Sequence, residues 1–152
     1  MKVNRRRFLI TSVAFSTAGI ALFKSSLANA EWNATDFAPG PFDATMKQLL
    51  NGKPIVETDK IDLNIPEIAE NGALVPVTVS SSIKDIQNIA IVIEQNPVPL
   101  AIQAALMPEL EPFLSARLKI ANTSFVFALA ETEKVFYSIK KKVKVTIGGC
   151  GG

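Results

Sequence analysis

The chain has 152 residues, with 16 basic and 14 acidic side chains, one cysteine and no histidine. This composition excludes an intramolecular disulfide and lacks the nitrogen ligand preferred for zinc, copper or haem. The usual general base of nucleophilic catalysis is also missing. We therefore predict no metal, no cofactor and no catalytic residue within this chain.

The first 30 residues have the pattern of an export signal. A basic start is followed by an apolar stretch that ends at Phe23 and by an Ala-x-Ala sequence that ends at Ala30. The apolar stretch is short for a membrane anchor, which favours cleavage after Ala30. Arg5-Arg6-Arg7-Phe8-Leu9 is similar to the twin-arginine consensus, although ordinary secretion also accepts a basic cluster. We predict a twin-arginine signal over residues 1–30 and a periplasmic protein without a membrane segment.

Removal of this signal changes the charge of the protein. The segment holds five of the 16 basic residues and none of the 14 acidic ones, so 11 basic residues remain in a mature chain of net charge −3. A mildly acidic domain is a poor partner for nucleic acid or an anionic membrane surface. We expect neither kind of binding.

The remaining 122 residues suffice for one domain, predicted over residues 31–147. A lead segment, Glu31 to Pro41, precedes a predicted helix over residues 43–52, with Asp43 as its N-cap and Gly52 as its stop. The apolar face of this helix consists of Met46, Leu49 and Leu50.

Beyond the helix, apolar and polar residues alternate with period two, which is typical of strands. The predicted strands cover residues 61–65, 75–79, 89–93, 113–120, 125–130, 135–140 and 143–147. Turn signals such as Asn71-Gly72, Asn96-Pro97 and Met107-Pro108 separate some of them. Short strands without intervening helices favour an antiparallel β-sandwich of immunoglobulin-like type, with a small barrel as the alternative. The Cys…Trp…Cys pattern of antibody domains is missing.

The single cysteine lies in a run of glycine. Cys150 is flanked by Gly148 and Gly149 on one side and by Gly151 and Gly152 on the other. This composition predicts a solvated thiol on a flexible arm over residues 148–152, anchored by the preceding strand. The arm would extend about 10 Å beyond Ile147, at roughly 3.6 Å per residue. Alternatives are a disulfide handle to another chain, a lipid attachment site, an incidental thiol without a role, or a ubiquitin-like carrier that uses its terminal Gly-Gly.

Lysines crowd the strand that leads to this arm, in the run Lys140-Lys141-Lys142-Val143-Lys144. Such lysines protect a strand edge against aggregation, and we prefer this reading. The alternative is attraction of anionic sulfur compounds to the arm. The acidic residues Glu109, Glu111, Glu131 and Glu133 are interpreted as solvated surface.

The segment from Val143 to Gly152 closely resembles the C-terminus of the SoxY family, sulfur carriers of bacterial thiosulfate oxidation. The resemblance extends to Ile65–Gly72 with Val75-Pro76-Val77, to Asn96-Pro97-Val98-Pro99 and to the twin-arginine leader. Two stretches depart from the expected pattern, Arg117-Leu118-Lys119 and the turn Glu131-Thr132-Glu133-Lys134.

The resemblance implies a periplasmic carrier that holds sulfur intermediates covalently on Cys150 and is not itself an enzyme. It implies a heterodimer with a SoxZ-like β-sandwich subunit. It also implies three enzymatic partners: a haem-containing conjugating enzyme, a sulfate-releasing hydrolase and a sulfur oxidase. The alternative function is an exported β-sandwich interaction module whose cysteine forms an intermolecular disulfide.

Overall fold

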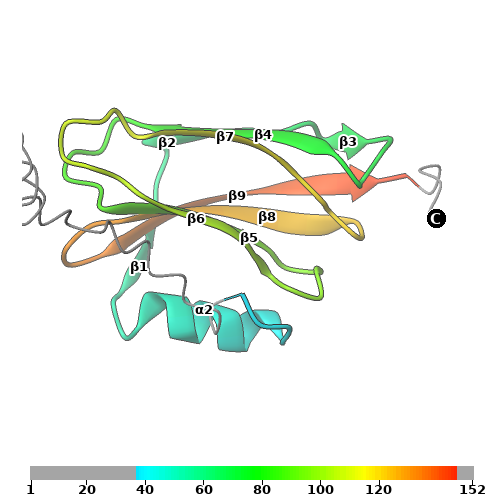
Figure 1. Cartoon of the computed structure of the whole chain (residues 1–152), viewed down its shortest axis with the longest axis horizontal. Helices are drawn as coiled ribbons and strands as arrows, with labels where there is room; N and C mark the ends of the chain where they lie inside the picture. Colours follow the sequence, from blue (N-terminus) through cyan, green and yellow to red (C-terminus); the bar gives the residue numbers. More distant parts are fainter. Residues whose placement is uncertain (1–36, 147–152) are drawn as a thin grey trace, which may run out of the picture. The chain divides into compact units, whose positions relative to one another are not determined.

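The computed structural model describes residues 37–146. These residues form two β-sheets and one helix, stacked in three layers (Figure 1). The strands are β1 Ile55–Glu57, β2 Ile61–Asn64, β3 Ile68–Ala69, β4 Val75–Ser81, β5 Asn88–Ile93, β6 Leu100–Ala105, β7 Phe113–Leu118, β8 Ser124–Glu131 and β9 Phe136–Val145. In residues 37–146 no helix has the length and apolar character needed to cross a membrane.

The predicted helix is confirmed as α2, Phe42–Leu50, but its cap is different. Asp43 was expected at the N-cap; instead Pro41 takes that position in an extended conformation, and its carbonyl accepts a hydrogen bond from the Thr45 N–H at 3.2 Å. Asp43 therefore lies in the first turn, where its charge favours the helix N-terminus. Asn51 ends the helix in the left-handed region with φ 46°.

The predicted β-sandwich is confirmed. One sheet has the order β1-β9-β8-β5-β6, with β3 also paired to β9, and the other has the order β2-β4-β7. The main ladders are antiparallel, whereas β1 and β3 run parallel to β9. The sequence pattern missed β1, β3 and β6.

The larger sheet is covered on both faces, which explains the composition of β5. Ile89, Ile91 and Ile93 face the smaller sheet, whereas Ala90 and Val92 face the helix side. All five are buried. Phe42 of α2 packs on this second face, with its ring centroid 5.0 Å from that of Phe127. The helix thus covers part of the sheet that would otherwise face water.

The two strands predicted over residues 135–140 and 143–147 are one strand, β9, within the described residues. It pairs with β8 without interruption from Phe136↔Glu131 to Val143↔Ser124. The consecutive lysines at its centre looked like a break because they interrupt the alternation of apolar side chains. Ladder hydrogen bonds do not depend on that alternation, so the strand continues.

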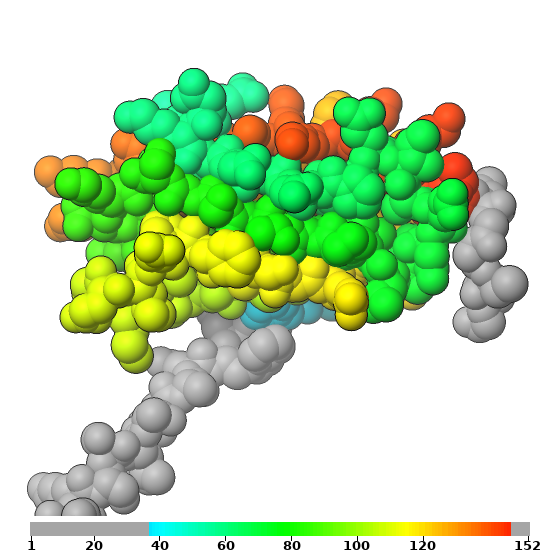
Figure 2. Space-filling model, turned by 90° about the horizontal axis from the view of Figure 1, so that it is seen from above, coloured from blue at the N-terminus to red at the C-terminus, as the bar shows by residue number. Residues whose placement is uncertain are grey.

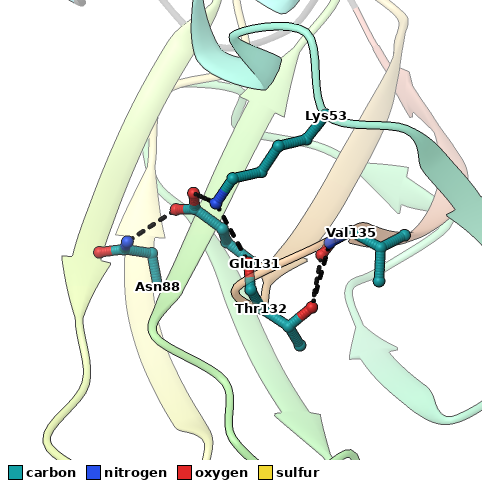
Figure 3. Close-up of polar contacts among 5 residues, drawn as sticks. All are labelled: Lys53, Asn88, Glu131, Thr132 and Val135. Atoms are coloured by element: carbon teal, nitrogen blue, oxygen red, sulfur yellow. Dashed lines mark hydrogen bonds and ion pairs between the residues drawn. The ribbon is translucent and has the colours of Figure 1, made fainter.

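The turn between β8 and β9 is held by side chains (Figure 3). Lys53 donates to Glu131 Oε1 at 2.7 Å and to the Thr132 carbonyl at 3.1 Å, and Asn88 donates to Glu131 Oε2 at 2.7 Å. Thr132 closes the turn through its hydroxyl, which donates to the Val135 carbonyl at 2.8 Å. The interpretation of Glu131 as solvated surface was therefore wrong: its side chain is only 16% exposed and joins three segments.

Gly72 marks a close backbone approach near the end of β9. Its carbonyl accepts a hydrogen bond from the Ile120 N–H at 2.7 Å. A Cβ atom at Gly72 would lie 2.5 Å from the Ile120 carbonyl oxygen and 2.9 Å from Val145 Cγ1. No side chain fits this position without displacement of backbone.

We predict that Gly72→Ala lowers the free energy of unfolding by about 1–3 kcal/mol, because the new methyl group forces the contacting backbone apart. Chemical denaturation measures this loss. Gly40→Ala is the matched control, since nothing lies within 4 Å of a Cβ there, and it should change stability by less than about 0.5 kcal/mol. Equal stability of the two variants would contradict the close approach.

Candidate functional site

The C-terminal end of β9 is held from both sides. On one side the Lys144 N–H donates to the Glu67 carbonyl at 2.8 Å and the Thr146 N–H donates to the Ala69 carbonyl at 3.1 Å. On the other side the Val145 N–H donates to Thr123 Oγ1 at 3.0 Å. The last described residues are thus fixed by β3 and by the segment before β8. Figure 1 shows β3 beside the end of β9.

The predicted alternation at this end is confirmed as far as Val145. Val143 is buried and Val145 is partly buried in the core between the sheets, whereas Lys142 and Lys144 are exposed. The exit of β9 is therefore anchored by two apolar side chains, with its lysines in solvent.

The residues predicted to carry the chemistry lie outside the described residues. They are Cys150 with Gly148, Gly149, Gly151 and Gly152 in the predicted arm, and Arg5, Arg6, Arg7, Phe8 and Leu9 in the predicted signal. Thr146, the last described residue, precedes Cys150 by four positions.

An aromatic and basic surface lies on the helix side of the larger sheet, close to the end of β9. The Phe125 side chain is 37% exposed, and the ammonium groups of Lys140 and Lys142 each lie 5.8 Å from its ring centroid. Lys140 also lies 6.0 Å from the Phe127 ring. These distances are within the range of cation–π attraction, so the rings help to order the lysine side chains.

Thr123 was not identified from the sequence, and Glu67 was noted only as part of the stretch Ile65–Gly72. Each lies in a loop, and each acts on β9 through a contact that only the folded chain creates. A hydroxyl residue just before a strand was the only local signal for Thr123.

Two open hollows differ in character. One, of about 790 Å³, lies beside β9 and is lined by Ile65, Glu67, Ile68, Thr123, Lys141, Lys142 and Lys144. The other, of about 600 Å³, lies between the β4–β5 and β6–β7 loops at the opposite end of the sandwich, and includes the exposed Met107 and Leu110. Among residues 37–146 no group of three or more histidine, cysteine, aspartate or glutamate side chains is arranged to hold a metal ion.

Comparison with solved structures finds a close relative. The sulfur carrier protein SoxY from Chlorobium limicola f thiosulfatophilum is 35% identical to this chain and superposes with a TM-score of 0.64; the match covers 69% of this chain and 96% of that one. The superoxide reductase neelaredoxin from Ignicoccus hospitalis is 20% identical with a TM-score of 0.52, over 59% of this chain and 82% of that one. This second likeness concerns the fold alone.

No curated protein matches the sequence significantly. The family model described as sulfur oxidation protein SoxY matches residues 46–150, which is more than half of the chain and includes the cysteine. Together with the Chlorobium structure, this match shows that the chain belongs to the SoxY family of sulfur carrier proteins.

Proposed function

We propose that this protein carries sulfur intermediates covalently on Cys150 and presents them to partner enzymes in the periplasm. The observation that carries the proposal is the family match, which extends to Cys150 itself. The thiol is the only one in the chain, so a covalent sulfur carrier has no other cysteine to use.

The anchored end of β9 supports delivery of the thiol to a partner. Hydrogen bonds to Glu67, Ala69 and Thr123 fix the chain up to Thr146. Four residues at roughly 3.6 Å each let Cys150 reach about 14 Å from that point. Glycine on both sides of the cysteine adds no side-chain bulk, so the thiol fits a narrow channel in an enzyme.

The chemistry is divided between the carrier and its partners. Coupling of the Cys150 thiolate to thiosulfate forms an S–S bond and releases two electrons, which a haem-containing conjugating enzyme accepts. A hydrolase then adds water to the terminal sulfonate sulfur, and sulfate leaves a persulfide on Cys150. A sulfur oxidase then converts the outer persulfide sulfur to a sulfonate, with oxygen atoms from water and six electrons passed to the electron acceptor of that enzyme. A second hydrolysis releases sulfate and restores the Cys150 thiol. The carrier works as a heterodimer with a SoxZ-like subunit.

This division agrees with the composition of the chain. It has no histidine to serve as a general base or as a metal ligand. The SoxY carrier is therefore proposed to be a substrate-bearing protein without catalytic activity of its own, exported by the twin-arginine route.

We predict that Cys150→Ser abolishes thiosulfate turnover in a system reconstituted with the partner enzymes, because serine cannot form the S–S bond. Folding stability should change by less than about 0.5 kcal/mol, the usual range for surface substitutions. Sulfate release and thermal unfolding are the two measurements. Normal turnover by the serine variant would end the carrier proposal, whereas an intermolecular disulfide handle would leave turnover intact and lose only a covalent dimer.

The flanking glycines have a separate role that can be tested. Gly149→Val and Gly151→Val should slow enzymatic loading of Cys150 on the order of tenfold or more, because small misplacements of a reacting group cost this much. A β-branched side chain adds bulk and stiffens the backbone at the same time. Alanine at either position should have an intermediate effect.

The control is the reaction of each variant with iodoacetamide, which meets no channel and should proceed at nearly the wild-type rate. The ratio of the loading rate to the alkylation rate is the quantity to compare. An unchanged ratio for both valine variants would reject insertion into a channel and leave the covalent role of Cys150 untouched.

A further inference from the structure

The outer edge of β9 is only partly covered. β1 pairs with it over Phe136–Ser138 and β3 pairs with it over Lys144–Val145. Between them, the stretch Ile139–Val143 has no strand on that side among the described residues.

Backbone donors point into this gap. The Phe136 and Lys144 N–H groups donate toward the β1 and β3 side, to Pro54 at 2.9 Å and to Glu67 at 2.8 Å. Alternate residues of a strand direct their backbone groups to the same edge, so the N–H groups of Lys140 and Lys142 face the gap as well. No backbone partner for these two is found in the described part of the chain.

The hollow of about 790 Å³ borders the β3 end of this gap, since Lys141 and Lys142 line it together with Lys144. Lys141 is on the face of Ile139 and Val143, whereas Lys142 and Lys144 are on the opposite face, as strand alternation requires. Figure 2, which views the smaller sheet, shows orange-red atoms of β9 along the upper edge among the cyan and green segments.

The charges around the hollow are unbalanced. No carboxylate within residues 37–146 lies within 4.0 Å of the ammonium groups of Lys141, Lys142 or Lys144. Glu67 is the one carboxylate among the described lining residues. The hollow therefore carries an excess of two positive charges, in a mature chain whose expected net charge is −3.

Protection of an exposed edge accounts for only some of these lysines. It explains Lys140, Lys141 and Lys142, which lie in the uncovered stretch. It does not explain Lys144, because β3 already covers the edge at that residue. A hollow lined by three lysines and one glutamate, with the free N–H of Lys142 on the same edge, is an arrangement suited to an oxyanion.

We propose that this hollow binds the sulfonate group of a sulfur oxyanion, either free thiosulfate or the sulfonate end of an adduct on Cys150. The tethered source rests on the proposed carrier function. Cys150 is four residues beyond Thr146, which gives a reach of about 14 Å, enough to fold back toward Lys144. Tethering supplies an effective concentration in the millimolar range, so a weak site on the surface is occupied.

The first experiment tests the free anion and needs no carrier chemistry. Cys150→Ser protein is titrated with sodium thiosulfate, and sodium chloride at equal ionic strength is the control. Side-chain NMR signals of the lysine Cε groups report binding. We expect saturable shifts at Lys141 and Lys144 with thiosulfate alone, and no such shift at Lys134, which lies in the turn at the other end of β9.

Substitutions then test which charges matter. Lys141→Gln and Lys144→Gln should each weaken the apparent affinity about two- to fivefold, the range for exposed ion pairs. Lys134→Gln should leave it unchanged. Glu67→Gln removes the opposing carboxylate and should strengthen binding by a similar factor.

The second experiment tests the tethered group. Tetrathionate loads wild-type protein: the Cys150 thiolate attacks a central sulfur, an S–S bond forms, and thiosulfate leaves and is removed by dialysis. Lys141 and Lys144 should then shift without added anion, whereas the iodoacetamide-blocked protein should show no shift. Blocking with iodoacetamide adds no sulfonate, so it isolates the effect of the charge.

The outcomes distinguish binding of free thiosulfate from binding of the sulfonate tethered to Cys150. Shifts in the first experiment alone assign the hollow to the free anion, and shifts in the second alone assign it to the tethered sulfonate. Equal responses to thiosulfate and chloride, together with no response to loading, would overturn the site. Failure of the proposed carrier function would instead appear as a lack of enzymatic loading at Cys150. Neither of the two experiments requires enzymatic loading.

Discussion

The uninterrupted pairing of β9 with β8 is the constraint on which the rest of this structure depends. Eight consecutive cross-strand pairs, from Glu131↔Phe136 to Ser124↔Val143, hold the strand in the larger sheet. β1 and β3 then add to the other edge of β9, at its two ends. The direction in which the chain leaves the domain follows from this pairing, because the hydrogen bonds continue up to Thr146.

Close packing also fixes the end of β9, where the chain leaves the larger sheet. Gly72 brings the segment after β3 against the Ile120 backbone and Val145 at once, and only a residue without a Cβ permits that approach. Thr123 holds the same end of β9 from the β8 side. At the far end, Glu131 fixes the hairpin turn through Lys53 and Asn88. A ten-residue strand secured at both ends is a stiff base for the segment after Thr146, which we propose is presented to other proteins.

Much of the fold was predictable because its strands follow simple alternation. β2 and β4 bury every second residue, as the sequence indicated. The elements that were missed carry no such pattern. All three residues of β1 are exposed and β3 has only two residues, so both exist because β9 offers an edge to pair with. β6 contains small and partly buried residues that give little contrast between its faces.

The candidate site likewise has one part that is visible in the local sequence and one part that only the fold assembles. Cys150 was singled out from the local sequence alone, as a single cysteine among glycines, and its role stays a prediction. The lysine-lined hollow could not, because it depends on where β1 ends and β3 begins along β9. Glu131 was misread for a related reason, since its partners Lys53 and Asn88 are distant in sequence. Local patterns thus point to a candidate thiol, whereas they miss the contacts that folding assembles.

Whether Cys150 bears sulfur during thiosulfate oxidation is measured most directly by intact and peptide mass spectrometry of the protein isolated from cells that are oxidising thiosulfate. We expect sulfur-containing adducts that are confined to the C-terminal peptide with Cys150, are removed by a reducing agent and are lost when thiosulfate is withheld. An unmodified thiol under these conditions, or a mass increase equal to a second polypeptide, would contradict it.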